Sequence, residues 1–284
     1  MGNFVYTPRA APSRCSGLAC YPPVMLDDAT CHALARELDE ARRARRPIQS
    51  LTQRNANLDL VDAYRVMRAG IGLRVAQGEA VCGYKMGFTS QAKREQMKLH
   101  DPIYGMLTEH MRVEDVFRVS RCIHPRAEAE IAFIVGREIR EPVDREEALS
   151  CIASVFAGIE ILDSRYRDFK LFSLPDVVAD NSSSSHFAIS EDARAPGGLD
   201  MTRLRMRLLF DGEVRGEAES SAISGDPVQS LVQLSNMLCD EKQEIAAGSL
   251  ILSGAATPAF PLAVGMTVKL EVTGLAPVSF RCVE

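Results

Sequence analysis

The sequence predicts an α+β fold in which a short helical N-terminal part packs on a mostly β body. Apolar side chains recur at helical spacing within residues 27–79, and from about residue 80 short apolar runs alternate with turns. Strands do not alternate regularly with helices and no glycine-rich phosphate loop is present, which argues against a dinucleotide-binding fold. We therefore expect a flexible N-terminal arm at 1–26, a helical part at 27–79 and a mixed-β domain at 80–284.

Two helices are predicted in the N-terminal part. The first begins near the aspartate caps Asp27 and Asp28 and ends before Pro47, because proline lacks the N–H that a helix interior needs. The second begins at another cap, Asp59, and ends before Gly78.

The basic run from Arg42 to Arg46 has two interpretations. A solvated helix C-terminus, which the helix dipole favours, is the far more common explanation of such a run. An anion-binding patch is the alternative.

Short apolar or alternating runs predict the strands of the β body. They lie at 80–87, 127–135, 152–162, 203–210, 249–253 and 266–273, with a further candidate at 277–283. Asp211 and Gly212 lie between two alternating runs and predict a two-residue hairpin turn. Asp226 and Pro227 predict the start of a helix that continues to about Leu238, and Ser182 to Ser185 are typical of a loop.

Composition and charge narrow the class of protein. With 284 residues, 46% of them hydrophobic and 25% charged, the chain resembles an average soluble globular protein. Its net charge of −5 argues against a nucleic acid or an anionic membrane as partner, so we expect neither. No apolar run approaches the ~18 residues of a membrane helix. The eight cysteines are scattered without a C-x₂-C pair, which favours reduced thiols in a cytoplasmic protein.

Two glutamates in one run form the first half of a candidate metal site. Glu128 and Glu130 are two residues apart in a predicted strand and therefore face the same side. Their carboxylates repel each other unless solvent or a cation lies between them. Spacing alone leaves a solvated strand face as the more common explanation.

Glu160 favours a metal site over a solvated strand face. It lies within the apolar run from Val155 to Leu162, where a carboxylate needs a cation, hydrogen bonds or protonation. Three oxygen ligands with no neighbouring histidine or cysteine suit Mg²⁺ or Mn²⁺ rather than zinc. A structural salt bridge remains the alternative for Glu160 alone.

Lys85 is the candidate positive group. It is flanked by Gly83 and Gly87, and glycines on a strand edge remove bulk that would keep a ligand away. A lone lysine usually faces solvent, so this signal is weak by itself.

Six motifs together resemble the fumarylacetoacetate hydrolase superfamily. They are Lys85–Ser90, Asp101–Thr108, Glu128–Glu130, Ile159–Tyr166, Leu174–Asn181 and Gly248–Gly254. The resemblance runs from about residue 45 to the C-terminus, with the motifs in family order. Within the superfamily they are most similar to the branch of 4-oxalocrotonate decarboxylases and 2-hydroxypentadienoate hydratases, which act in meta-cleavage degradation of aromatic compounds.

The resemblance implies a mixed β-roll of this type, with a catalytic domain that depends on Mg²⁺ or Mn²⁺. The metal ligands would be Glu128, Glu130 and Glu160, and the active-site lysine would be Lys85. Segments that line the substrate pocket contain Ser164, Ser253 and Leu107. The substrate would be a small 2-oxo dicarboxylic acid, and the protein a homo-oligomer or a complex with the pathway hydratase.

Residue 103 favours a decarboxylase. Hydratases of the branch carry an acid two residues before the glycine, whereas this chain has Ile103 before Tyr104 and Gly105. A decarboxylase benefits from a dry wall around the departing carboxylate, whereas a hydratase must deliver a proton and activate water. His100 stands where relatives carry an aspartate, either as a surface substitution or as an altered pocket acid. A hydratase, an acylpyruvate hydrolase and a non-catalytic partner subunit remain the alternatives.

Overall fold

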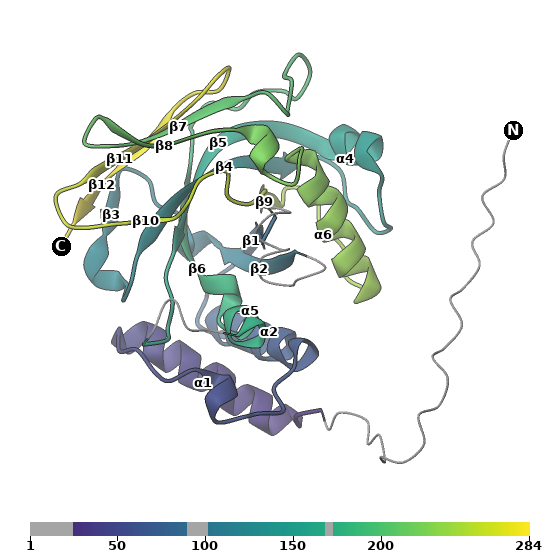
Figure 1. Ribbon diagram of the computed structural model, residues 1–284. Helices are drawn as coiled ribbons and strands as arrows, with labels where there is room; N and C mark the ends of the chain where they lie inside the picture. Colours follow the sequence, from purple (N-terminus) through teal and green to yellow (C-terminus); the bar gives the residue numbers. More distant parts are fainter. Residues whose placement is uncertain (1–24, 90–101, 168–172) are drawn as a thin grey trace, which may run out of the picture.

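Two capped helices begin the part of the chain that the computed structural model describes, which comprises residues 25–89, 102–167 and 173–284. The carboxylates of Asp27 and Asp59 accept hydrogen bonds from first-turn N–H groups of α1 (Asp28–Ala44) and α2 (Leu60–Ala76). The two helices pack against each other below the sheets in Figure 1. Both predicted helices and both caps are confirmed.

A seven-stranded mixed sheet follows. Its strands are β1 (Val81–Gly87), β2 (Ile103–Thr108), β4 (Arg126–Val135), β5 (Ile152–Leu162), β6 (Ser184–Ile189), β9 (Leu250–Leu252) and β10 (Phe260–Pro261). The strand order is β2-β1-β9-β4-β5-β6, and β10 pairs with β4 (Figure 1). β1 and β9 run parallel, whereas the other paired strands of this sheet are antiparallel.

A second sheet of five strands packs beside it. Its strands are β3 (Val116–Arg118), β7 (Arg205–Phe210), β8 (Glu213–Glu219), β11 (Thr267–Val272) and β12 (Val278–Val283), in the order β3-β12-β11-β7-β8. β7, β11 and β12 contact β4, β5 and β6 of the larger sheet. The predicted hairpin turn joins β7 to β8, with φ of 52° at Asp211 and 83° at Gly212.

Three further helices complete the described chain. α4 (Arg145–Cys151) packs with α6 (Val228–Asp240), and α5 (Leu174–Ala179) packs on α2. α6 begins one residue later than predicted, because Pro227 is its N-cap and Asp226 accepts a hydrogen bond from the N–H of the first helical residue. None of the helices in the described ranges is long and apolar enough to cross a bilayer.

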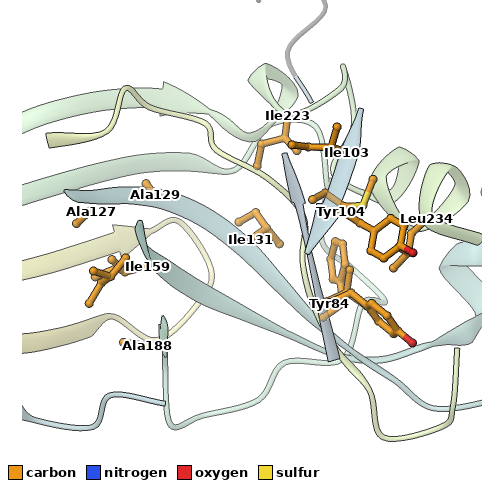
Figure 2. Packing of buried hydrophobic residues seen from close by; sticks show 14 of the residues in the cluster. Tyr84, Ile103, Tyr104, Ala127, Ala129, Ile131, Ile159, Ala188, Ile223 and Leu234 are labelled. Atoms are coloured by element: carbon orange, nitrogen blue, oxygen red, sulfur yellow. The ribbon is translucent and has the colours of Figure 1, made fainter. Parts of the chain in front are cut away.

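The two faces of the larger sheet bury different side chains. One face carries the main core, which includes Tyr84, Tyr104 and Ile131 of the sheet and Leu234 of α6 (Figure 2). The opposite face carries a smaller apolar cluster that consists of Leu107, Met111, Ala132, Phe156, Phe187, Leu250 and Leu252. The sheet is therefore buried on both sides, and a charged group on the second face is surrounded by hydrocarbon.

Four strands were not predicted, namely β2, β3, β6 and β10, and β8 was predicted only as the second run of the hairpin. The serines that begin β6 are typical of a loop, yet β6 pairs with β5 over five residues, so tertiary pairing overrides local propensity. Only Ser182 and Ser183 of the predicted loop lie outside the strand. β2 and β3 are short and contain few alternating polar positions, which removes the period-two signal.

Candidate metal centre

Three glutamates converge on the second face of the larger sheet. β4 pairs with β5 so that Glu128 lies directly opposite Glu160, and Glu130 lies one alternation further along β4. One carboxylate oxygen from each residue lies within 4.8 Å of the others. All three side chains are buried, with Glu130 and Glu160 at 0% exposure. We refer to these three residues as the glutamate triad.

The triad carries more buried negative charge than its protein surroundings satisfy. Oε1 of Glu130 and Oε1 of Glu160 have no hydrogen-bond partner among the described residues. The pKa of Glu130 is raised well above its usual value, first by burial and then by repulsion from Glu160 and Glu128. A divalent cation between the three groups offsets both penalties. The oxygen-only donor set suits Mg²⁺ or Mn²⁺, so the residues present fit such an ion.

Lys85 on β1 is a cation that the structure places against the triad. Its Nζ lies 3.0 Å from Oε2 of Glu160 and donates a hydrogen bond to the carbonyl oxygen of Ser182 at 3.2 Å. Burial opposes the charged ammonium, but the nearby carboxylates outweigh burial, so the pKa of Lys85 is raised. The triad contains more carboxylates than the one ammonium of Lys85 can pair with, and its oxygen donors would suit one divalent cation.

Gly83 and Gly87 were predicted to lie on a strand edge and to leave room for a ligand, and this prediction is wrong. β1 is not at the sheet edge, because it lies between β2 and β9. A Cβ on Gly83 would lie 1.8 Å from the carbonyl oxygen of Leu250, and a Cβ on Gly87 would lie 3.0 Å from Cγ1 of Ile103. The glycines therefore make room for neighbouring strands rather than for a ligand.

Ser253 lies on the chain next to Gly254, whose backbone contacts the triad. Its hydroxyl donates to the carbonyl oxygen of Ile131 at 2.7 Å, which ties the end of β9 to β4. The next residue, Gly254, donates its N–H to Oε2 of Glu130 at 2.7 Å. Sequence reasoning missed this backbone donor, because no side chain marks it.

Ser164 and Leu107 occupy different surroundings. Ser164 is buried after β5, and its hydroxyl accepts a hydrogen bond from the N–H of Tyr166 at 3.2 Å. Leu107 is fully buried on β2, on the face that carries Lys85, where it belongs to the smaller apolar cluster. His100 lies outside the described residues.

A left-handed turn that the sequence did not single out supports Lys85. Asn181, Ser182 and Ser183 have φ of 51°, 52° and 58°, a region that non-glycine residues rarely adopt. Three successive residues of this kind are costly and persist only where their surroundings hold them.

The Asn181 side chain provides that support. Its Oδ1 accepts the N–H of Met106 at 2.8 Å, and its Nδ2 donates to the Met106 carbonyl oxygen at 2.9 Å. Ser182 donates its hydroxyl to the Tyr104 carbonyl oxygen. A Cβ on Gly105 would lie 2.7 Å from the Asn181 carbonyl oxygen, so glycine allows the turn to dock on β2. These hydrogen bonds hold the turn in place, so that the Ser182 carbonyl oxygen faces Lys85. The only sequence signal for the turn was the tolerance of asparagine for left-handed backbone.

Known proteins share this chain's sequence and fold. A 4-oxalocrotonate decarboxylase from Pseudomonas sp is 40% identical over 249 residues, which cover 87% of this chain and 96% of that protein. A 2-hydroxyhexa-2,4-dienoate hydratase from Comamonas testosteroni is 34% identical over 265 residues, which cover 92% of this chain and 100% of that protein.

A solved structure agrees with these relatives. The 4-oxalocrotonate decarboxylase from Pseudomonas putida G7, complexed with magnesium and adipate, matches with a TM-score of 0.88 at 32% identity, over 91% of this chain and 99% of that chain. The family model for the fumarylacetoacetate (FAA) hydrolase C-terminal region matches residues 82–283. With that match and relatives above 30% identity over most of their length, the chain belongs to the fumarylacetoacetate hydrolase family.

Proposed function

We propose that the chain is a metal-dependent decarboxylase that converts 4-oxalocrotonate (2-oxohex-3-enedioate) to 2-hydroxypenta-2,4-dienoate and CO₂. This reaction belongs to the meta-cleavage degradation of aromatic compounds. The observation that carries the proposal is the buried glutamate triad with Lys85 against it, an oxygen-only donor set that suits one divalent cation. The 40% identity to a 4-oxalocrotonate decarboxylase supports this choice of substrate.

The glutamate triad would hold Mg²⁺ or Mn²⁺. When bound, such an ion supplies a Lewis acid for the 2-oxo acid end of the substrate and stabilises the negative charge that develops there. Magnesium in the related decarboxylase from Pseudomonas putida G7 supports this assignment. Gly254 orients Glu130 through its N–H, so the ligand oxygen is positioned by backbone as well as by strand register.

Lys85 would act on the substrate rather than on the metal. Its raised pKa keeps the ammonium protonated at neutral pH, and its fixed position adds positive charge where the substrate's oxyanion or carboxylate lies. The Ser182 carbonyl and Glu160 hold the ammonium in place, so little reorganisation is needed during reaction. We therefore assign Lys85 as the catalytic residue of the chain.

The remaining pocket residues would shape the cavity. Leu107 contributes an apolar wall on the face that carries Lys85. The Ser253 hydroxyl donates its hydrogen bond to the carbonyl oxygen of Ile131, so it could only accept a hydrogen bond from a substrate. Its other role would be to orient Gly254. Ser164 lies at the end of β5, where its hydroxyl is free to donate because the contact with Tyr166 uses it as an acceptor.

The surroundings of Ile103 favour decarboxylation over hydration. Ile103 is 2% exposed and pairs with Gly87 across β1 and β2. A Cβ on Gly87 would lie 3.0 Å from Cγ1 of Ile103 and 3.6 Å from Nζ of Lys85. Because both atoms are close to this one point, the hydrocarbon side chain of Ile103 lines the lysine on this side. An apolar wall excludes the water that a hydratase must activate.

The alternatives keep specific support. The 34% identity to a hydratase leaves addition of water to a 2-hydroxydienoate as the second candidate activity. A non-catalytic partner subunit is less well supported, since the triad and the lysine are both complete. An acylpyruvate hydrolase is less well supported because it needs a general base for water, and the sequence shows no obvious histidine dyad. We further propose that the chain is a cytoplasmic homo-oligomer or associates with the pathway hydratase, which light scattering of the purified chain with and without that hydratase tests.

The activity is tested with the purified, EDTA-treated chain, to which Mg²⁺ is returned. Release of CO₂ from 2-oxohex-3-enedioate that requires the returned metal supports the decarboxylase. Consumption of 2-hydroxypenta-2,4-dienoate without CO₂ release from the first substrate would replace it by the hydratase.

Removal of one triad charge tests the metal ligands. In Glu130→Gln and Glu160→Gln we expect Mg²⁺ affinity to fall by about 100-fold or more, since the loss of even an indirect partner costs about 10–100-fold. Isothermal titration with Mg²⁺ measures this affinity. Glu138→Gln is the matched control, because Glu138 is exposed and pairs with Arg140 at 2.6 Å. Wild-type affinity in both triad variants would exclude these ligands.

Replacement of the lysine separates catalysis from metal binding. In Lys85→Met we expect kcat to fall by about 10²–10³-fold, as when one charge-stabilising donor is lost. Mg²⁺ affinity should stay equal or increase, because a positive charge near the ion is removed. Steady-state kinetics and Mg²⁺ titration measure the two effects, with Lys269→Met, a partly exposed lysine on β11, as control. An unchanged kcat would remove Lys85 from the mechanism.

Disruption of the left-handed turn tests the positioning of Lys85. In Asn181→Ala, loss of both bonds to Met106 releases the turn, and we expect kcat to fall by about 10–100-fold at unchanged Mg²⁺ affinity. Asn55→Ala is the control, since Asn55 also donates to a backbone carbonyl but lies in the helical part. Equal kcat in Asn181→Ala and the wild type would show that the turn does not position the lysine.

A further inference from the structure

A second charged cavity lies away from the glutamate triad, between the helical part and the start of β6. Its volume is about 300 Å³. Five arginines line it, namely Arg42, Arg43, Arg45, Arg74 and Arg121. Neither Lys85 nor any triad residue is among its lining residues. We call it the arginine cavity.

The arginines reach this cavity from three separate elements. Three of them lie at the C-terminus of α1, where the helix dipole favours positive charge. Arg74 comes from the last turn of α2, and Arg121 comes from the short turn that follows β3. A helix dipole favours the arginines at the C-termini of α1 and α2, but it does not explain why both helix ends and Arg121 converge on the same space.

The acidic groups nearby do not balance these cations. Arg42 and Arg43 share one carboxylate, Asp39, at 2.7 and 3.0 Å, and Arg74 pairs with Glu79 at 2.8 Å. Asp163 also lines the cavity, but its carboxylate accepts three backbone N–H bonds from Ile123 and His124.

Two of the arginines have no carboxylate partner. Within the described ranges, neither Arg45 nor Arg121 has an acidic group within ion-pair distance, and Arg45 donates only to the carbonyl oxygen of Ser120. Five arginines therefore face three carboxylates, which leaves a surplus of two positive charges.

A half-buried histidine lies among the same arginines. His186 lines the arginine cavity and bonds to Ser185 Oγ through Nδ1 at 2.8 Å. The pKa of His186 is lowered to about 4, first by burial and then by the charges of Arg74 and Arg121. The imidazole is therefore neutral at physiological pH and adds no positive charge to the cavity.

We propose that the arginine cavity binds a small polyanion with two or more carboxylate or phosphate groups. Guanidinium groups pair with both kinds of oxyanion in bidentate geometry, and the surplus charge matches a dianion. A volume of about 300 Å³ is at the lower end of small-molecule sites, which fits a compact ligand. This site is separate from the metal centre and does not depend on the proposed activity.

Calorimetry on the full chain saturated with Mg²⁺ tests the site. The probes are inorganic phosphate and propane-1,2,3-tricarboxylate at low ionic strength, and the relative affinity for the two distinguishes a phosphate ligand from a carboxylate ligand. We expect saturable binding of one probe molecule per chain. Binding should weaken at least tenfold in the double variant Arg45→Gln/Arg121→Gln, whose exposed side chains are not needed for folding.

Two variants locate the binding. Arg203→Gln/Arg215→Gln removes two exposed arginines elsewhere and should bind the probes like the wild type. In Glu130→Gln any probe held at the metal centre is lost, whereas the binding that depends on Arg45 and Arg121 should remain. Bound anion should also move the pKa of His186 upward, measured by NMR of the imidazole. Absence of saturable binding for both probes, or equal affinity in the wild type and the Arg45/Arg121 variant, would overturn the proposal.

Discussion

The structure depends on the burial of three carboxylates around one point with a single ammonium beside them. Glu128, Glu130 and Glu160 bring oxygen atoms within 4.8 Å of one another on a face that is otherwise apolar. Such an arrangement is strongly unfavourable unless a cation compensates it, because desolvation and mutual repulsion both penalise the charged forms. This excess of buried carboxylates is why we propose the site as a binding site for a divalent cation rather than a structural ion pair.

The rest of the fold holds this arrangement in place. The β4–β5 register sets Glu128 opposite Glu160, and the end of β9 delivers the Gly254 N–H to Glu130. The turn at 181–183 presents a carbonyl oxygen to Lys85, and its strained backbone is held by the hydrogen bonds between the Asn181 side chain and β2. Both main-chain groups are fixed before a substrate arrives, which is the condition for electrostatic preorganisation.

The three glutamates could be predicted from local sequence signals, whereas Lys85 gave only a weak signal and was identified by the family resemblance. Period-two spacing places Glu128 and Glu130 on one face, and a charge within an apolar run identifies Glu160. The main-chain groups could not be predicted, because they depend on which segments meet in three dimensions. The same limit explains β6, whose serines signal a loop until β5 pairs with them, and Gly83, whose open side is filled by β9 rather than by a ligand.

The most direct test of the metal centre is the location of Mn²⁺ by anomalous diffraction from crystals of the full chain. The triad predicts one Mn²⁺ within bonding distance of oxygens from Glu128, Glu130 and Glu160, with Lys85 beside the ion but not bound to it. Saturating Mn²⁺ that leaves these carboxylates without a metal, or binds only elsewhere on the chain, would contradict the account.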